Sequence, residues 1–167
     1  MAHFSAGVEY GLHCLLYLVD LPKDSGNPSV RDLAELQGVP VEYLAKIFTR
    51  LRKAGLVTAM EGAAGGYRLA RPGEHITLLD VVRAIDGWKP LYKCQDVRAR
   101  CAVFDGKPPP WATQGACWIN GIMYEAHKRL EDSLAMYSLA EVAGRMIAST
   151  PAEHQVSVAA WLEKRRQ

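Results

Sequence analysis

Apolar residues recur at helical spacing along much of the chain, and interruptions of that spacing divide it into segments. Residues 4–21 predict a helix, because apolar side chains return there every three or four positions. This stripe consists of Val8, Leu12, Leu15, Leu16 and Val19. The stretch PKDSGNP, residues 22–28, then predicts a loop, since proline and glycine interrupt regular structure.

Two helices separated by a short turn are predicted next. Ser29 is a suitable N-cap for a helix over residues 30–37, and Asp32 completes a capping box. The turn GVP, residues 38–40, leads into a second helix that ends at Gly55. A short helix, a turn that contains glycine and a second helix rich in surface polar groups are typical of the helix-turn-helix motif.

A β-hairpin follows this motif. Two short β-prone runs, LVTAM and YRLARP, flank the glycine-rich stretch EGAAGG. A hairpin directly after a helix-turn-helix predicts a winged helix. Thr77 then predicts the start of a further helix, LLDVVRAID, in which Asp80 occupies the capping-box position.

The segment from Gly87 to Gly115 differs in kind, because it holds three successive prolines and several glycines. We expect it to be mostly loop, and a loop of this length in a compact domain is usually functional or disordered. A long amphipathic helix is predicted after it, ending near Tyr137. Its apolar stripe consists of Ile119, Ile122, Met123, Ala126, Leu130 and Leu134. A short helix capped by Ser138 and a final segment that begins at Pro151 and has a basic end complete the chain.

The predicted fold is mainly α: a winged helix-turn-helix domain with a two-stranded wing, plus a long dimerisation helix. We expect a DNA-binding domain over residues 1–86, a cysteine-bearing sensor loop over 87–115, and dimerisation and C-terminal helices over 116–167. The long helix could instead pack on its own winged domain. We favour the dimer, because a two-fold protein matches a two-fold DNA site.

Charge supports contact with nucleic acid. The net charge of the chain is only +2, but residues 41–75 contain six basic and three acidic residues. A local basic surface is typical of a nucleic-acid-binding protein, although basic helices are often no more than solvated faces. No window approaches the roughly 20 uninterrupted apolar residues of a membrane helix, and the N-terminus lacks the features of a signal peptide. We therefore expect a cytoplasmic protein without membrane contact.

The cysteines point to metal or redox chemistry. There are four of them, Cys14, Cys94, Cys101 and Cys117, and the last three fall within 24 residues. Structural disulfides are not expected in a reducing cytosol. Clustered cysteines in a segment with few secondary-structure signals favour a metal or redox site.

Three stretches together resemble a known family: YLAKIFTRLRKAGLV, GGYRLARP and ITLLDVVRAIDG. The chain is similar to the Rrf-type (Rrf-two) bacterial winged-helix transcriptional regulators, the IscR, NsrR and RsrR group. The resemblance extends over nearly the whole chain. It implies a homodimer that binds palindromic double-stranded operator DNA and often carries an iron–sulfur cluster as its sensor.

The opening helix most resembles the RsrR-type subgroup, through the stretch GVEYGLHC and the C-terminal AWL. In that subgroup a Glu and a His of this helix bind a [2Fe–2S] cluster together with two cysteines. The resemblance therefore implies that Glu9 and His13 bind one side of a cluster, while Cys117 with Cys94 or Cys101 binds the other. Cys117 best matches the last family cysteine and Cys94 the first.

The residue chemistry agrees with this assignment. Side chains at positions i and i+4 share one helix face, so Glu9 and His13 can reach one metal. Thiolates suit iron, and replacing them by imidazole or carboxylate alters the charge and the potential of a cluster. The alternatives are a hydrogen-bonded Glu9–His13 pair at the edge of the core, and loop cysteines that bind zinc or form a disulfide. Cys14 is either a buried small hydrophobe or a redox thiol.

The DNA-binding residues are expected on the second helix of the motif and on the wing, facing the major groove or phosphate. The candidates are Ser29, Val41, Glu42, Tyr43, Lys46, Arg50, Arg52, Arg68 and Arg71. Family wings often carry an arginine just before the glycine-rich turn, whereas this chain has Glu61 there. A carboxylate at this place repels the DNA backbone, so we expect a weaker grip or a different operator.

The sequence thus predicts a homodimeric transcriptional regulator, and favours a repressor over an activator. Its operator binding is expected to be controlled by an iron–sulfur cluster that senses redox state or nitrosative and oxidative conditions. It predicts no enzyme, since a catalytic elbow and a phosphate loop are both lacking. Two alternatives stay open. One is a cluster-free, thiol-based redox regulator. The other is a metalloprotein for electron transfer, because a fold does not fix a function.

Overall fold

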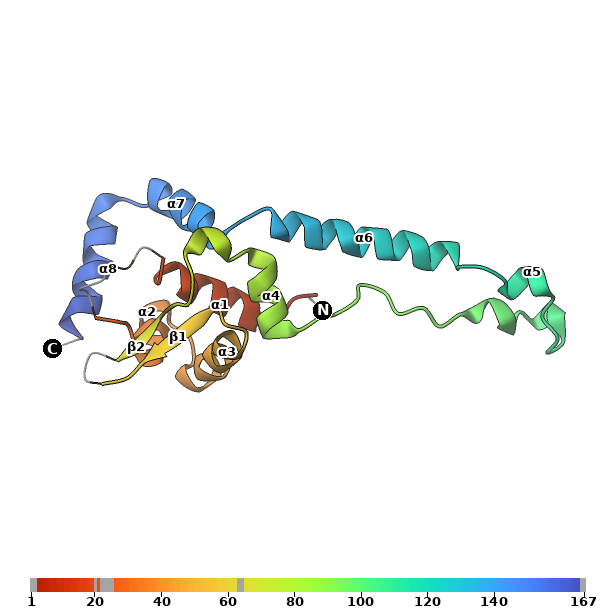
Figure 1. The fold of residues 1–167 in the computed structure, drawn as a ribbon, viewed down its shortest axis with the longest axis horizontal. Helices are drawn as coiled ribbons and strands as arrows, with labels where there is room; N and C mark the ends of the chain where they lie inside the picture. The colour runs from red at the N-terminus through yellow and green to blue at the C-terminus, as the bar shows by residue number, and fades with distance from the viewer. Residues whose placement is uncertain (1–2, 20, 22–25, 63–64, 166–167) are drawn as a thin grey trace. The chain divides into compact units, whose positions relative to one another are not determined.

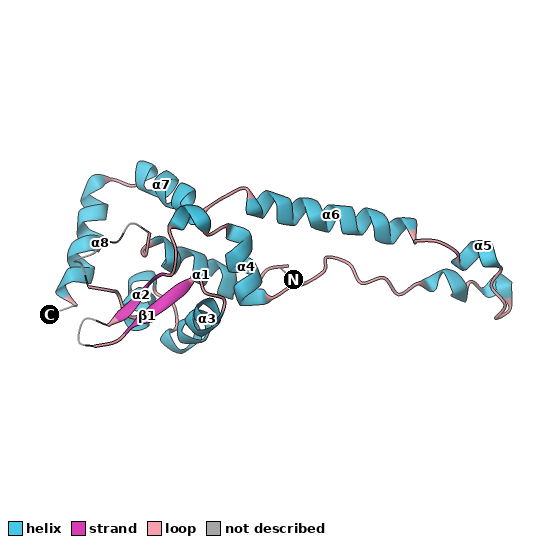
Figure 2. Ribbon diagram, viewed as in Figure 1, coloured by secondary structure: helices cyan, strands magenta, loops and turns pink. Residues whose placement is uncertain are grey.

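The computed structural model describes residues 3–19, 21, 26–62 and 65–165. Figure 1 shows the order of the elements, and Figure 2 shows that helices predominate, with one small sheet. The chain divides into two units. The first combines residues 1–88 with 133–167, and the second consists of residues 89–132.

The first unit begins with helix α1, Ala6–Leu16. This helix is shorter than the predicted residues 4–21 because its last turn tightens. Leu18 N–H bonds to Leu15 O at 2.9 Å and Val19 N–H to Leu16 O at 3.3 Å. Bonds to the third preceding residue are typical of a helix that is ending.

The predicted helix-turn-helix is confirmed as helices α2, Val30–Gln37, and α3, Val41–Lys53. Ser29 and Asp32 form the expected capping box at the start of α2. Gly38 follows α2 with φ 66°, a left-handed conformation that glycine adopts without strain. The buried face of α3 consists of Leu44, Ile47, Phe48 and Leu51.

The wing is an antiparallel pair of strands, β1, Val57–Met60, and β2, Gly66–Leu69. Val57 pairs with Leu69 and Met60 with Gly66. The wing is joined to the segment before α2, because Tyr67 N–H donates to Pro28 O at 2.9 Å. The winged helix is therefore confirmed, strand by strand.

Three more helices complete the first unit: α4, Leu78–Asp86, α7, Leu139–Ser149, and α8, Ala152–Lys164. A short 3₁₀ turn, Gly73–His75, precedes α4. The starts of α4 and α7 are bonded to each other, since Leu78 N–H donates to Tyr137 O at 2.9 Å and Leu139 N–H to Ile76 O at 2.8 Å. The capping boxes expected at Thr77 and Ser138 are both present.

The core of the first unit lies between α1, α2, α3, α4 and α7, with Phe48, Leu15, Leu33, Leu44 and Leu139 among its fully buried side chains. Figure 1 places α1 among α2, α3 and α4. Helix α1 contacts each of the other four helices of this core.

The second unit contains three short helical turns and most of the long helix. The turns are Val97–Arg100, Ala102–Phe104 and helix α5, Pro110–Thr113, and the long helix α6 covers Trp118–Ala135. Residues 87–115 are thus mostly loop, as predicted, with three turns added. No helix in the described part of the chain is long and apolar enough to cross a membrane.

Candidate sensor site and nucleic-acid interface

The stretch GVEYGLHC gives α1 two different sides, because it contains two pairs of residues at i and i+4 spacing. Gly7 and Gly11 are buried, whereas Glu9 and His13 are exposed. A β-carbon at Gly11 would lie 2.5 Å from Ile85 Cδ1, and one at Gly7 would lie 3.0 Å from Tyr43 Oη. Glycine therefore lets α1 approach α3 and α4 closely on one side, while the other side presents a carboxylate and an imidazole.

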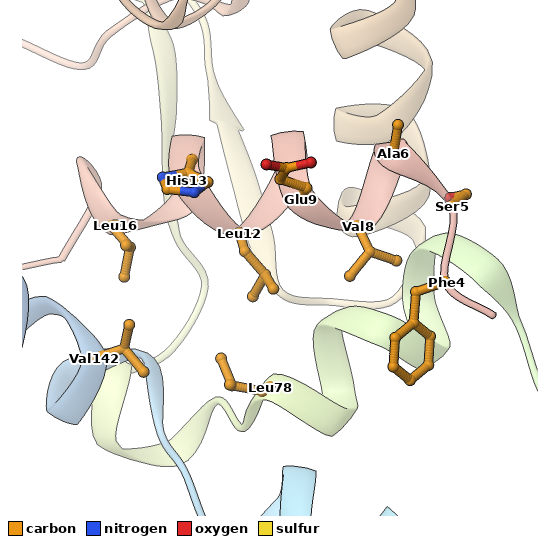
Figure 3. Close-up of a pocket in the computed structure, with 10 residues that line it drawn as sticks. All are labelled: Phe4, Ser5, Ala6, Val8, Glu9, Leu12, His13, Leu16, Leu78 and Val142. Atoms are coloured by element: carbon orange, nitrogen blue, oxygen red, sulfur yellow. The ribbon is translucent and has the colours of Figure 1, made fainter. Parts of the chain in front are cut away.

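Glu9 and His13 adjoin an apolar groove of about 590 Å³ formed by α1, the start of α4 and α7. Figure 3 shows Val8, Leu12 and Leu16 pointing from α1 toward Leu78 and Val142. The lining residues are Phe4, Ser5, Ala6, Val8, Glu9, Leu12, His13, Leu16, Leu78 and Val142. The two polar side chains thus lie beside a surface that is otherwise largely hydrophobic.

Neither Glu9 nor His13 makes a hydrogen bond or ion pair with any described residue. The alternative in which they form a hydrogen-bonded pair at the edge of the core is therefore not what the structure shows. Both side chains retain their full capacity to accept a ligand, and a carboxylate and an imidazole one helical turn apart can share one metal centre.

Cys94 and Cys117 meet in the second unit. Cys117 stands just before α6, and its sulfur lies near the backbone N–H groups of Asn120 and Ile119 and near the Cys94 side chain. The Asn120 N–H, the Ile119 N–H, the nearby Arg98 guanidinium and Cys94 together hold the pKa of Cys117 below its ordinary value. A helix N-terminus favours a thiolate for the same reason.

Arg98 holds the two cysteine-bearing segments together. Its Nε donates to Asp96 Oδ1 at 2.7 Å, and its Nη1 donates to Gly115 O at 3.2 Å. Asp96 N–H in turn donates to Cys94 Sγ at 3.4 Å. Arg98 was not among the predicted site residues. The signal available in the sequence was a run of two arginines, RAR, between two cysteines.

The other two cysteines lie elsewhere. Cys101 is exposed, between two 3₁₀ turns. Cys14 is fully buried in the core, with its sulfur 3.9 Å from Leu33 O. Burial raises the pKa of the Cys14 thiol to about 12. Cys14 therefore has the properties of a buried small hydrophobe, the first of the two alternatives considered for it.

Four of the side chains described above could serve as ligands of an iron–sulfur cluster. Among the described residues no three His, Cys, Asp or Glu side chains of one chain gather as a metal site. The chain instead offers two separate pairs, Glu9 with His13 and Cys94 with Cys117. Two thiolates, one imidazole and one carboxylate fit the chemistry of an iron–sulfur centre when the pairs come from two subunits.

The predicted DNA-contact residues of α3 form an exposed surface. Glu42, Tyr43, Lys46 and Arg52 are exposed, and Val41 at the start of the helix is half-buried. The Tyr43 ring packs edge-on against Tyr10 of α1, with ring centroids 5.9 Å apart. Side chains on this face of a recognition helix are in a position to enter the major groove.

The other residues predicted to contact DNA also make hydrogen bonds within the protein. Arg50 Nη1 donates to Ile85 O at 2.6 Å, and Arg68 Nε donates to Asn27 Oδ1 at 2.9 Å. Arg71 Nε donates to His75 O at 2.8 Å, and its Nη2 lies 3.2 Å from Asp80 Oδ2. Ser29 caps α2. These arginines therefore stabilise the helix-turn-helix and the wing as well as adding positive charge.

The profile of the Rrf2 family, described as an iron-dependent transcriptional regulator, matches residues 4–145. The chain belongs to the Rrf2 family. It is accordingly a member of a family of DNA-binding transcriptional regulators.

Sequence relatives agree with this membership. Protein rrf2 of Nitratidesulfovibrio vulgaris is 33% identical over 114 residues, which are 68% of this chain and 69% of that protein. An HTH-type transcriptional regulator of Mycobacterium tuberculosis is 42% identical over 94 residues, which are 56% of each chain. The match with the mycobacterial relative therefore spans little more than half of its length.

Solved structures show the same fold. IscR of T. potens has a TM-score of 0.65 and 24% identity, over 93% of this chain and 96% of that one. CymR of B. subtilis, the global cysteine regulator, has a TM-score of 0.64 and 22% identity, over 87% and 98%. An oxidised form of CymR from Staphylococcus aureus has a TM-score of 0.59 and 24% identity, over 85% and 96%. At these identities the likeness concerns the fold alone.

Proposed function

We propose that this Rrf2-family protein is a homodimeric cytoplasmic regulator whose operator binding is controlled by an iron–sulfur cluster, of the [2Fe–2S] type. The observation that carries the proposal is the pair of preformed donor sets. Glu9 and His13 stand together on α1 without hydrogen-bond or ion-pair partners among the described residues, and Arg98 joins the segments that carry Cys94 and Cys117.

The ligands are proposed to come from two subunits. Cys94 and Cys117 of one subunit would hold one side of the cluster, and the partner subunit's Glu9 and His13 would hold the other. Cys101 is left out of this set, because it is exposed and Cys94 already accompanies Cys117. When bound, the cluster supplies a centre that gains or loses an electron and so responds to redox, oxidative or nitrosative conditions.

The dimer is supported by the surface of α6. Ile119, Ile122 and Tyr124 are each more than 60% exposed, and Trp118 is 87% exposed. Apolar side chains gathered along one helix are typical of an interface between chains. A two-fold dimer would present two recognition helices to a palindromic operator.

The protein's own contacts suggest how the site would reach the DNA. The glycine side of α1 touches Ile85 and Tyr43, directly behind Glu9 and His13. Ile85 is bonded through its carbonyl to Arg50 of the recognition helix. A displacement of α1 by ligands at Glu9 and His13 would therefore change the position of α3. We propose a repressor, in which this change alters the fit to the operator.

The test is anaerobic purification followed by visible absorption and iron and sulfide analysis, on the wild type and on matched variants. We expect charge-transfer absorption with stoichiometric sulfide. We expect it to be lost in Cys94→Ser and Cys117→Ser, and to be lost or altered in the double variant Glu9→Ala/His13→Ala. Cys101→Ser is the matched cysteine control and should retain it.

DNA binding supplies the second readout. Promoter DNA bound by the wild type should be held with different affinity when the cluster is oxidised, reduced or removed. A colourless, iron-free protein after anaerobic purification that still binds DNA would contradict the cluster. It would make Glu9 and His13 structural residues and direct attention to the thiols.

A thiol-based regulator is the second candidate, favoured by the contact between Cys94 and Cys117 and the low pKa of Cys117. With hydrogen peroxide as oxidant, the two thiols would give up two electrons and two protons to form a disulfide, and the hydrogen peroxide would become two water molecules. A non-reducing gel and mass analysis after peroxide would show a disulfide between residues 94 and 117. Failure to form one would count against this candidate.

A further inference from the structure

The C-terminal helix α8 lies outside the part of the chain that matches the family. The match ends at residue 145, whereas α8 covers Ala152–Lys164. It belongs to the first unit, with Leu162 only 6% exposed. The helix therefore lies beyond the residues that define the family match, and it packs on the first unit.

Arg165, the residue directly after α8, reaches α2, the first helix of the helix-turn-helix. Arg165 forms an ion pair with Glu35, and its Nη1 lies 3.8 Å from Asp32 Oδ1. The guanidinium also stacks over the Trp161 ring, 4.3 Å from its centroid. Stacking and pairing fix the direction of the guanidinium better than an exposed ion pair alone, which contributes little.

Both carboxylates, Asp32 and Glu35, belong to α2, the first helix of the helix-turn-helix. In a helix-turn-helix the first helix, here α2, crosses the sugar–phosphate backbone while the second enters the major groove. Asp32 is needed there, since its Oδ2 accepts from Ser29 N–H at 2.9 Å and thereby caps α2. Without compensation, Asp32 and Glu35 would present two negative charges toward phosphate.

We propose that Arg165 of α8 completes the DNA-binding surface by neutralising Asp32 and Glu35, so that the phosphate backbone can approach α2. The side chain of Lys164, exposed at the same end of α8, adds a further positive charge. This role of α8 rests on DNA binding by the winged helix and not on any iron–sulfur site. The partner of α8 and Arg165 would thus be the DNA backbone next to the operator bases.

The experiment measures binding of the full-length protein to a fluorescein-labelled duplex of mixed sequence, about three helical turns long, across a salt series. We expect Arg165→Ala to weaken binding roughly three- to tenfold at low salt, because two carboxylates are uncovered. Arg165→Lys should keep much of the affinity. Adding Glu35→Gln to Arg165→Ala should recover much of the loss, since it removes one of the uncovered charges.

Arg145→Ala on α7 is the matched control, because it removes the same charge from an arginine that also stacks on an aromatic ring, Tyr137. It should leave binding nearly unchanged. The proposal is overturned if Arg165→Ala binds as the wild type does or no worse than Arg145→Ala. It is equally overturned if Glu35→Gln gives no recovery, since Arg165 would then only attach α8. Circular dichroism of each variant checks that the helices remain folded.

Discussion

Arg50 of the recognition helix donates a hydrogen bond from Nη1 to the backbone carbonyl of Ile85, at 2.6 Å. Ile85 is in the last turn of α4, and Arg50 is in the last turns of α3. The next residue, Asp86, accepts hydrogen bonds from Ser5 N and Oγ at 2.9 and 2.5 Å, at the start of α1. One turn of α4 thus links α1, which carries Glu9 and His13, to α3, the second helix of the helix-turn-helix.

Replacing Arg50 should therefore affect stability as well as DNA binding. We expect Arg50→Ala to lower the free energy of unfolding by about 1–2 kcal/mol, because a charged donor to a backbone carbonyl is lost. Arg52→Ala, on the same helix but with a side chain that makes no hydrogen bond to described residues, should change it by less than about 0.5 kcal/mol. Urea unfolding of both variants measures the difference, and equal effects would show that the Ile85 contact contributes nothing.

Two glycines should respond to alanine in opposite directions. A β-carbon at Gly66 would lie 2.2 Å from Asn27 O, so Gly66→Ala must displace backbone where the wing joins α2. We expect a loss of about 1–3 kcal/mol. At Gly144, within α7, a β-carbon meets no described atom within 4 Å. Gly144→Ala should stabilise the protein by up to about 1 kcal/mol, because alanine favours a helix. Thermal unfolding measures both.

Cys14 should make stability depend on pH at the alkaline end. Burial raises the pKa of its thiol to about 12 in the folded protein, from an ordinary value of 9.0. The folded state therefore favours the neutral thiol. Its contribution to stability is complete below pH 9 and is lost as the pH rises toward 12, at about 1.4 kcal/mol for each unit of pKa difference.

The measurement compares urea unfolding of the wild type and Cys14→Ala between pH 8 and the alkaline limit of folding. The difference in stability between the two should shrink as the pH rises, because the Cys14 thiol ionises more readily in the unfolded chain than in the folded protein. Iodoacetamide at neutral pH should modify Cys101 long before Cys14. Rapid modification of Cys14 in the folded protein would contradict its burial.

Glu61, exposed at the end of β1 on the wing, should weaken DNA binding by repelling phosphate. We expect Glu61→Gln to bind a duplex more tightly and Glu61→Arg more tightly still. Each unit of positive charge that contacts phosphate should steepen the logarithmic salt dependence by about 0.9. Glu125→Gln on α6, with the same change of charge, is the control, and an equal gain there would show a general charge effect only.

Local patterns in the sequence were sufficient to predict most elements. Ser29 with Asp32, Thr77 with Asp80, and the glycine-rich EGAAGG between two β-prone runs each fix a boundary by short-range chemistry. For this reason the winged helix could be predicted from residues that are neighbours in the chain. The end of α1 could not, since its apolar stripe continues to Val19 while the backbone already turns at Leu16.

The pairing of distant residues was decided only by the tertiary structure. The sequence singled out Glu9 and His13 and left two cysteines open as companions of Cys117, because spacing along a loop does not fix which thiols meet. Folding brings Cys94 to Cys117 through Arg98. It likewise brings Arg50 to Ile85 and Arg165 to Glu35, contacts across 35 and 130 residues that no periodic pattern records. Periodicity reports which side of an element is buried, whereas only packing determines which side chains share a site.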